Sequence, residues 1–501
     1  MQAVNRKKTE QRGAGILLPI SSLPSDYGIG TLGKAAFQFV DFLKEAGQTY
    51  WQVLPVGPTG YGDSPYQSFS AFAGNPYFID LDLLIEEGLL KKRDVTSVQW
   101  QEQCTAVDYG RIYNGRFPVL RKAFSNSQHE ATEEFQMFCK ENSNWLEDYC
   151  LFMALKNHFL NQEWLRWDDA IKRREAAAIE QYKEELREEI GFWRFCQYKF
   201  YSQWKALLTY AHANGIQIIG DLPIYVALDS ADVWANPEQF QLDKKLRPKK
   251  VAGVPPDDFC ADGQLWGNPL YDWKAMEQDG FAWWKQRMCC AAKLYDLIRI
   301  DHFIGIVRYF SIPAKDTTAR NGIYKKGPGK KLTDAINSVV DSSRIIAEDL
   351  GLVVDAVVKL RNKNGYPGMK VMQFGFDGNP ANDHFPENYS ENTIVYGGTH
   401  DNEMILGYFS NQNEWIQNYT MQYLGVKSVD QIPWGMVKKA YTGIGKTVIF
   451  QAQDLLCLDN TARMNFPSST AGNWQWRLRK KQMGKGLASK LRKLAEKTDR
   501  I

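Results

Sequence analysis

The segment LIRIDHF, residues 297–303, joins a strand-like apolar run to charged residues and is the clearest guide to the fold. A run rich in Leu and Ile is typical of a parallel strand that helices cover on both faces. Asp301 directly follows this run, at a place where an ionised carboxylate loses water at a high cost. We therefore expect a partner or a function at the end of this strand that offsets the cost.

Six further segments repeat the pattern of a short apolar run that ends in polar residues, glycine or proline. They are residues 15–23, 49–58, 216–225, 343–351, 369–378 and 393–402. Helical patterns lie between them, and those at 34–47 and 194–215 each end in glycine, as helix C-caps commonly do. Strands that alternate with helices favour parallel βα units.

An eighth strand near residues 462–469 would complete a (β/α)8 TIM barrel, which is the α/β fold class that we predict. No G-x-G-x-x-G motif follows the first strand, so the dinucleotide-binding open sheet lacks its fingerprint. Two segments, at approximately 80–205 and approximately 226–290, are too long to be ordinary connections, which span about 2–6 residues. We therefore expect one catalytic domain over residues 1–501, in which the first segment is an inserted helical subdomain and the second is an inserted active-site subdomain.

The composition excludes several classes of function. The 61 Lys and Arg residues against 58 Asp and Glu leave a net charge of +3, too small to attract nucleic acid or a membrane surface. No window approaches the ~18 apolar residues of a membrane span, and the first residues lack the apolar part of a signal peptide. The eight cysteines show neither zinc-like nor disulfide-like spacing. We expect a cytoplasmic protein with no metal, nucleic acid or membrane partner.

Four acids each follow an apolar strand directly: Asp221, Asp301, Glu348 and Asp401. The carboxyl ends of all strands converge on one face of a βα barrel, so these side chains are expected to share a pocket. Any one of them could instead cap the next helix. Carboxyls that lie close together have pKa values that move apart, so one acid can stay protonated at neutral pH while another is ionised.

Arg299 and His400 are candidate partners for the acids that stay ionised, although a single His is more often a core residue. A protonated and an ionised carboxyl in one pocket can cleave a glycosidic bond. Loops rich in aromatic and short polar residues also favour a sugar ligand, because aromatic faces stack on sugar rings and polar groups bind hydroxyls. These loops are residues 61–80, 225–240, 251–273 and 471–477. Some of their aromatics are expected to pack on the insertions instead.

Seven motifs, in order along nearly the whole chain, resemble the amylomaltase or 4-α-glucanotransferase family, a barrel group related to α-amylases. They are SPYQSFSAFAGNPYFIDLDLL (64–84), IIGDLPIYV (218–226), GVPPDDFCADGQLWGNPLYDW (253–273), LIRIDHF (297–303), IIAEDLG (345–351), THDN (399–402) and GNWQWR (472–477). The resemblance implies a retaining enzyme that transfers α-1,4-glucan segments without a cofactor or metal. Its substrates would be maltooligosaccharides, amylose, or starch- or glycogen-derived glucans, with glucose as an acceptor.

The resemblance also implies roles for particular residues. The nucleophile corresponds to Asp301, the general acid/base to Glu348 and the transition-state stabiliser to Asp401. The substrate-binding positions would be Ser64, Tyr66, Asp221, Asp257, Trp266, Arg299, His302, Asp377, His400 and Asn473. Residues 251–259 correspond to a mobile loop of the family.

Two alternatives stay open from the sequence. A retaining α-glucan hydrolase would use the same acids with water as the acceptor, and single residues do not distinguish it from a transferase. A barrel that only binds glucan would have no need to bring acids together, so the set of strand-end acids disfavours it.

Overall fold

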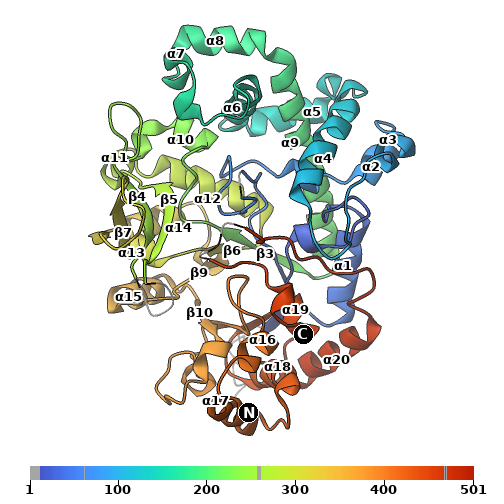
Figure 1. Cartoon of the computed structure of the whole chain (residues 1–501), viewed down its shortest axis with the longest axis vertical. Coiled ribbons are helices and arrows are strands. Elements are labelled where there is room, and N and C mark those ends of the chain that lie inside the picture. The colour runs from blue at the N-terminus through green and yellow to red at the C-terminus, as the bar shows by residue number, and fades with distance from the viewer. Residues whose placement is uncertain (1–11, 61, 257–260, 468, 470) are drawn as a thin grey trace, which may run out of the picture.

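The computed structural model describes residues 12–60, 62–256, 261–467, 469 and 471–501, and its centre is a parallel β-barrel (Figure 1). The strands are β1 (Gly13–Leu17), β2 (Tyr50–Gln52), β3 (Gln217–Leu222), β6 (Leu297–Ile300), β9 (Ile345–Ala347), β10 (Gly368–Val371), β11 (Thr393–Tyr396) and β12 (Thr447–Gln451). Their order is β10-β11-β12-β1-β2-β3-β6-β9. The Ala347 N–H donates to the Pro367 carbonyl at 3.0 Å and joins β9 to the start of β10. The predicted (β/α)8 class is confirmed.

The eighth strand is not the one that we predicted. It is β12, which pairs with both β11 and β1, whereas residues 463–467 form an irregular segment after the short 3-10 helix Asn460–Ala462. The apolar run TVIFQ of β12 continues directly into the helix α19 (Ala452–Leu455), so no turn residue marks its end. The sequence pattern therefore hides this strand within a longer apolar stretch.

Alternation along the strands separates the barrel interior from the helical layer. Residues at alternate positions form a small interior cluster, which contains Leu17, Ile219, Ile346, Met369, Ile394, Tyr396 and Ile449. Their neighbours in the sequence pack outward into the main core, among them Ile16, Ile218, Ile345, Val395 and Val448. This is the period of two that a strand imposes on its side chains. Both faces are apolar, which explains the continuous apolar runs.

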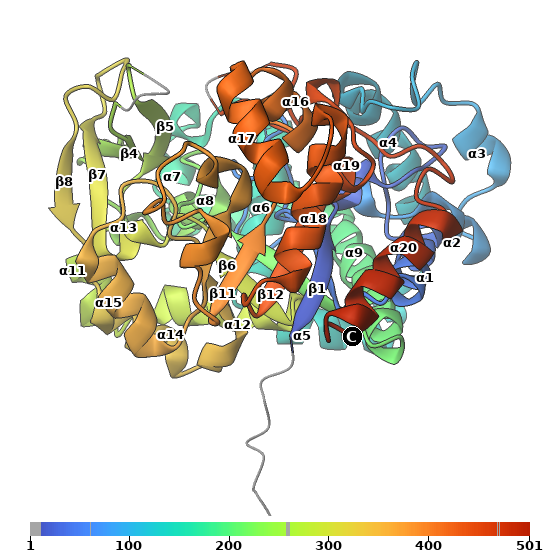
Figure 2. The same ribbon diagram turned by 90° about the horizontal axis from the view of Figure 1, so that it is seen from below.

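Helices surround the barrel, and Figure 2 shows β11, β12 and β1 side by side behind several of them. These helices are α1 (Lys34–Glu45), α12 (Ala282–Leu294), α13 (Ile304–Val307), α14 (Lys330–Asn337), α15 (Asp355–Asn364), α16 (Ile405–Ser410), α17 (Glu414–Leu424), α18 (Ile432–Thr442), α19 and α20 (Lys485–Lys497). Within the described part of the chain, we find no helix with the length and apolarity needed to cross a membrane.

The long connection between β2 and β3 carries most of the remaining helices, which gather at the top of Figure 1. They are α2 (Leu81–Glu86), α3 (Lys92–Thr96), α4 (Tyr109–Ser125), α5 (Glu133–Glu141), α6 (Leu146–His158), α7 (Asp169–Lys172), α8 (Ala176–Glu185) and α9 (Arg187–Ala213). The last of them, α9, leads into β3 and packs against α1, so it belongs to the barrel wall as well as to the insertion.

A second, antiparallel sheet lies beside the barrel, at the left of Figure 1. Its hairpin β4 (Lys250–Val254) and β5 (Gln264–Pro269) follows β3, flanked by α10 (Ala231–Ala235) and α11 (Trp273–Gln278). The strands β7 (Arg308–Pro313) and β8 (Ile323–Lys326) follow β6, and β4 pairs with β7. The insertion that we placed at approximately 226–290 thus shares its sheet with residues 308–326.

Arg500 ties the end of α20 to the barrel wall. Its side chain is fully buried and donates to backbone carbonyls around the start of β1 and the approach to β12. The acceptors are the carbonyls of Gly13 at 3.2 Å, Tyr441 at 2.9 Å, Gly443 at 3.1 Å, Gly445 at 2.8 Å and Lys446 at 3.1 Å. One guanidinium therefore satisfies several carbonyls where the barrel's first and last strands meet.

We expect Arg500→Leu to lower the thermal unfolding midpoint by roughly 5 °C, because each hydrogen bond from a charged donor contributes about 1.5–3 kcal/mol and the buried carbonyls lose their partner. Differential scanning calorimetry measures the shift. Lys493→Leu, on the exposed side of α20, is the matched control and should leave the midpoint unchanged. Equal shifts in the two variants would contradict the role of Arg500.

Candidate active site

Arg299 lies between two acids at the carboxyl ends of neighbouring strands. The register of β3 and β6 places Asp221 opposite Arg299, and Asp301 follows β6. The Arg299 Nη1 atom lies 2.6 and 2.7 Å from the two Asp221 oxygens and 2.8 Å from Oδ1 of Asp301. Burial opposes the charge of Arg299, but the surrounding carboxylates raise its pKa well above the usual value. A permanent cation therefore holds both carboxylates in place.

Glu348 follows β9 and is held by backbone amides. The N–H of His302 donates to its Oε2 at 2.6 Å and the N–H of Leu350 to its Oε1 at 2.9 Å. Burial raises the pKa of Glu348 to about 8, against the opposing charge of Arg299, and the charge of Asp301 adds to the rise. Glu348 is thus a carboxyl that holds a proton at neutral pH.

Asp401 and His400 follow β11 on another side of the pocket. The Asp401 side chain is 42% exposed, and its Oδ1 accepts from Nδ2 of Asn465 at 2.6 Å. The His400 ring is buried and stacks on the Tyr66 ring with 5.2 Å between centroids and 15° between planes. Asp401 therefore offers a fixed carboxylate that solvent or a ligand can reach.

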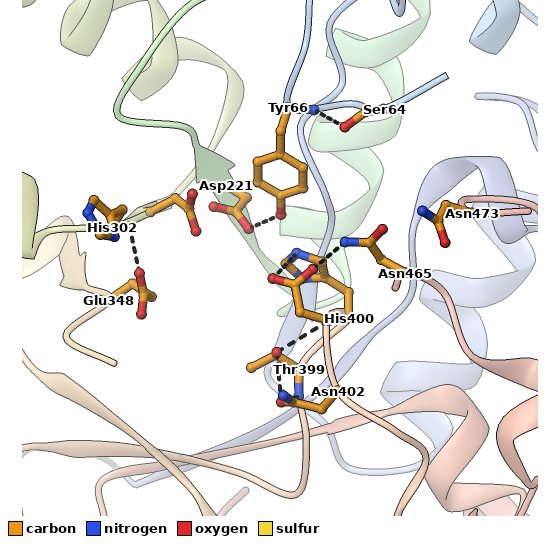
Figure 3. A network of polar contacts seen from close by, with 12 residues as sticks. Ser64, Tyr66, Asp221, His302, Glu348, Thr399, His400, Asn402, Asn465 and Asn473 are labelled. Carbon is orange, nitrogen blue, oxygen red and sulfur yellow. Dashed lines mark hydrogen bonds and ion pairs between the residues drawn. The ribbon is translucent and has the colours of Figure 1, made fainter. Parts of the chain in front are cut away.

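Tyr66 connects the two sides of the pocket, as Figure 3 shows. Its hydroxyl donates to Oδ2 of Asp221 at 2.8 Å, and burial raises its pKa well above the usual value, so the hydroxyl keeps its proton. The Ser64 hydroxyl accepts from the Tyr66 N–H at 3.3 Å and so acts on the turn that carries Tyr66. The aromatic ring is a wall of the pocket, and its hydroxyl is a further partner for Asp221.

Trp266 and His302 bring the small antiparallel sheet to the pocket. Trp266 is in β5, and its ring meets the His302 ring edge to face with 4.9 Å between centroids. His302 has a φ of +52°, a left-handed conformation that is uncommon outside glycine. Burial lowers the pKa of His302, which keeps the imidazole neutral. The same residue thus gives Glu348 a backbone donor and Trp266 a packing surface.

Two of the expected substrate-binding side chains are engaged within their own loops. Asp377 is exposed and accepts from the Asn379 N–H at 2.8 Å and from Nδ2 of Asn382 at 2.9 Å. Asn473 is buried, and its Oδ1 accepts from the Phe466 N–H at 2.9 Å. Among the described residues, neither side chain forms a hydrogen bond with a strand-end acid. Asp257 lies outside the described residues.

Sequence reasoning missed Asn465 and Arg463, which support Asp401. Arg463 donates from Nη2 to the Asp401 carbonyl and from Nε to the Asn465 carbonyl, each at 2.8 Å. Both residues lie in the segment that we interpreted as a strand, where their side chains would have alternated across a sheet. The available signal in the sequence was the presence of these polar residues in the segment that precedes the GNWQWR motif. Among the described residues, we find no group of three His, Cys, Asp or Glu residues that could hold a metal ion.

Comparison with known proteins agrees with this geometry. Residues 18–482 match the family model described as 4-alpha-glucanotransferase. The chain is 46% identical to the 4-alpha-glucanotransferase of Clostridium butyricum, over 95% of this chain and 98% of that one, and 44% identical to the Thermus thermophilus enzyme, over 98% and 99%. The structure of an amylomaltase from Streptococcus agalactiae in complex with acarbose superposes with a TM-score of 0.95 at 43% identity, covering 98% of this chain and 100% of that one. The family model covers residues 18–482, and the relatives are more than 40% identical over nearly their whole length. The chain therefore belongs to the 4-alpha-glucanotransferase family.

Proposed function

We propose that this protein transfers α-1,4-glucan segments from a donor glucan to the 4-OH of glucose or of a maltooligosaccharide, with retention at the anomeric carbon. The observation that carries the proposal is the arrangement at the strand ends, where Asp301 faces the cation Arg299 and Glu348 is buried with a raised pKa. Maltooligosaccharides, amylose, and starch- or glycogen-derived glucans are the donors that fit the family. The cytoplasmic location stays a prediction from the sequence.

In the first step, Asp301 attacks the anomeric carbon of the donor. The bond from that carbon to the glycosidic oxygen breaks, the oxygen keeps the electron pair, and Glu348 supplies the proton that it needs. Arg299 donates to Asp301 at 2.8 Å and holds this carboxyl in position, and it is itself held by Asp221. The product of this step is a covalent glucosyl-enzyme on Asp301.

In the second step, Glu348 acts in the opposite direction. Its carboxylate takes the proton of the acceptor hydroxyl as that oxygen attacks the anomeric carbon and the bond to Asp301 breaks. Asp401, held by Asn465, binds hydroxyls of the sugar as positive charge develops at its anomeric carbon. The enzyme returns to its starting protonation state.

A transferase must keep water from reacting with the glucosyl-enzyme. Water at ~55 M competes with dilute sugars, and holding the acceptor in place can supply about 7–11 kcal/mol of advantage. The β4–β5 hairpin is suited to this task, because Trp266 reaches His302 beside Glu348 and Pro255 and Pro256 stiffen the end of β4. Phe259, which we expected as an apolar cover, lies outside the described residues. Hydrolysis is the alternative outcome of the same chemistry.

Maltotriose distinguishes the two activities. A transferase is expected to produce glucose and a ladder of longer maltooligosaccharides with a constant number of reducing ends, because transfer conserves them and each hydrolytic cut adds one. Separation of the products and a reducing-end assay measure both quantities. A steady rise in reducing ends with no product longer than maltotriose would reject transfer and favour the hydrolase.

The raised pKa of Glu348 predicts the pH dependence of the first step. Glu348 must be protonated, so kcat/KM for maltotriose should be constant below a pKa of about 8 and fall about tenfold per pH unit above it. The control is α-glucosyl fluoride, whose leaving group needs no proton and whose kcat/KM should not fall over this range. Parallel pH profiles for the two donors would assign the titration to another group.

The contact between Asn465 and Asp401 predicts a positioning effect. Asn465→Ala removes the side-chain hydrogen bond to Asp401 Oδ1, and kcat should fall about 10–100-fold, as for other residues that orient a reacting group, with KM changed less than threefold. Steady-state kinetics with maltotriose measure the split. Asn411→Ala, an exposed amide after α16, should change neither constant. An unchanged kcat in Asn465→Ala would exclude the positioning role.

A further inference from the structure

Trp415, on α17, is unusual among the tryptophans of this protein. All 16 tryptophans lie in the described part of the chain, and Trp415 is the one whose side chain is largely exposed, at 60%. Tryptophan is enriched at binding surfaces, because it combines a large apolar ring with a polar N–H. The surroundings of the ring indicate what it binds.

The exposed ring is held in a fixed orientation. The Tyr419 ring, one helical turn along α17, stacks on it with 5.4 Å between centroids and 1° between planes. A Cβ atom on Gly378 would lie 2.4 Å from Cη2 of Trp415, so the backbone of the 377–382 loop lies close to the edge of the indole. Since Tyr419 covers one face, the exposed area belongs mainly to the opposite face. Trp415 thus presents a flat, pre-oriented apolar surface.

Two amide side chains lie on the same face of α17 as Trp415. Asn418 and Gln422 are three and seven residues after Trp415, so they share its face of α17. Asn418 and Gln422 are both exposed. Residues 410–418, SNQNEWIQN, contain one charged residue, Glu414. An aromatic face flanked by neutral donors and acceptors suits a sugar, whose ring faces are apolar and whose hydroxyls need both kinds of partner.

The location of Trp415 connects it to the pocket. Gly378 directly follows Asp377, which the family resemblance places along the glucan groove. In Figure 2, α17 lies at the end of the molecule toward which β11 and β12 run, the end that carries the strand-end acids. A long glucan that leaves the groove over the 377–382 loop would therefore reach this ring.

We propose that Trp415, Tyr419, Asn418 and Gln422 form a second binding site for α-1,4-glucan chains, outside the pocket of Asp301 and Glu348. It is called the α17 site below. The site rests on the proposed function in one respect, since the donor must be a glucan long enough to reach from the pocket to α17. Maltotriose needs only the pocket, so the α17 site should act on polymers alone.

The test measures binding without turnover. All variants carry Asp301→Asn, which is proposed to prevent formation of the glucosyl-enzyme. Their migration is measured in native gels that contain amylopectin, and the retardation gives a dissociation constant for the polymer. Trp415→Ala should weaken retardation about tenfold, as expected for loss of one stacking platform, and Trp415→Phe should restore most of it. Tyr113→Ala, which removes another exposed aromatic ring on α4, is the matched control and should bind as the parent does.

Kinetics of the otherwise unaltered enzyme complete the test. Trp415→Ala should raise KM for amylose and leave kcat/KM for maltotriose within twofold. Equal losses for both substrates would place Trp415 in the pocket, and unchanged amylopectin retardation would overturn the α17 site. If Trp415→Ala converts a dimer to a monomer in sedimentation velocity without changing glucan binding, the ring contacts a second copy and the proposal fails. Because the gel assay needs no activity, it decides the α17 site even if the transferase proposal fails.

Discussion

The contact of Arg299 with Asp221 and Asp301 is the interaction on which the rest of the pocket depends. Without the cation, two carboxylates at the ends of neighbouring buried strands would repel each other and lose their hydration without compensation. With it, the Asp301 carboxyl lies directly against a cation, whereas burial raises the pKa of Glu348 to about 8 although Arg299 and two backbone amides oppose the rise. The difference between two chemically similar carboxyls therefore comes from a direct contact with the cation in one case and from burial in the other.

The barrel brings these residues together with little help from the loops, whereas the second half of the pocket depends on segments that are distant in the sequence. Tyr66 comes from the β2–β3 connection and reaches Asp221 in β3, and Asn465 comes from the segment after β12 and reaches Asp401 in the turn after β11. The positions of the strand-end acids follow from the fold, but the orientation of Asp401 depends on how two irregular segments pack. The strands of the barrel supply the reacting groups, and the loops orient their side chains.

The sequence predicted the parts of the structure that obey a local rule. Apolar runs that end in Asp or Glu identified the site strands, since the strand period and the polar ending are both visible within ten residues. The strand β12 was missed because TVIFQ continues into α19 without a turn. The small sheet could not be predicted, because β4 and β7 come from separate insertions and pair only in three dimensions. The partners of Asp377 and Asn473 depend on loop conformations that no periodicity describes.

The closure of the barrel by β12 and Arg500 has a consequence for synthesis of the chain. β1 emerges from the ribosome early and can pair with β2, but its other edge is satisfied only by β12, more than 400 residues later. At 5–20 residues per second this interval lasts on the order of a minute. During that time an apolar strand with one unpaired edge is exposed to other nascent chains, and such edges promote aggregation. The nascent protein is therefore expected to need shielding by a chaperone until residue 500 has left the ribosome.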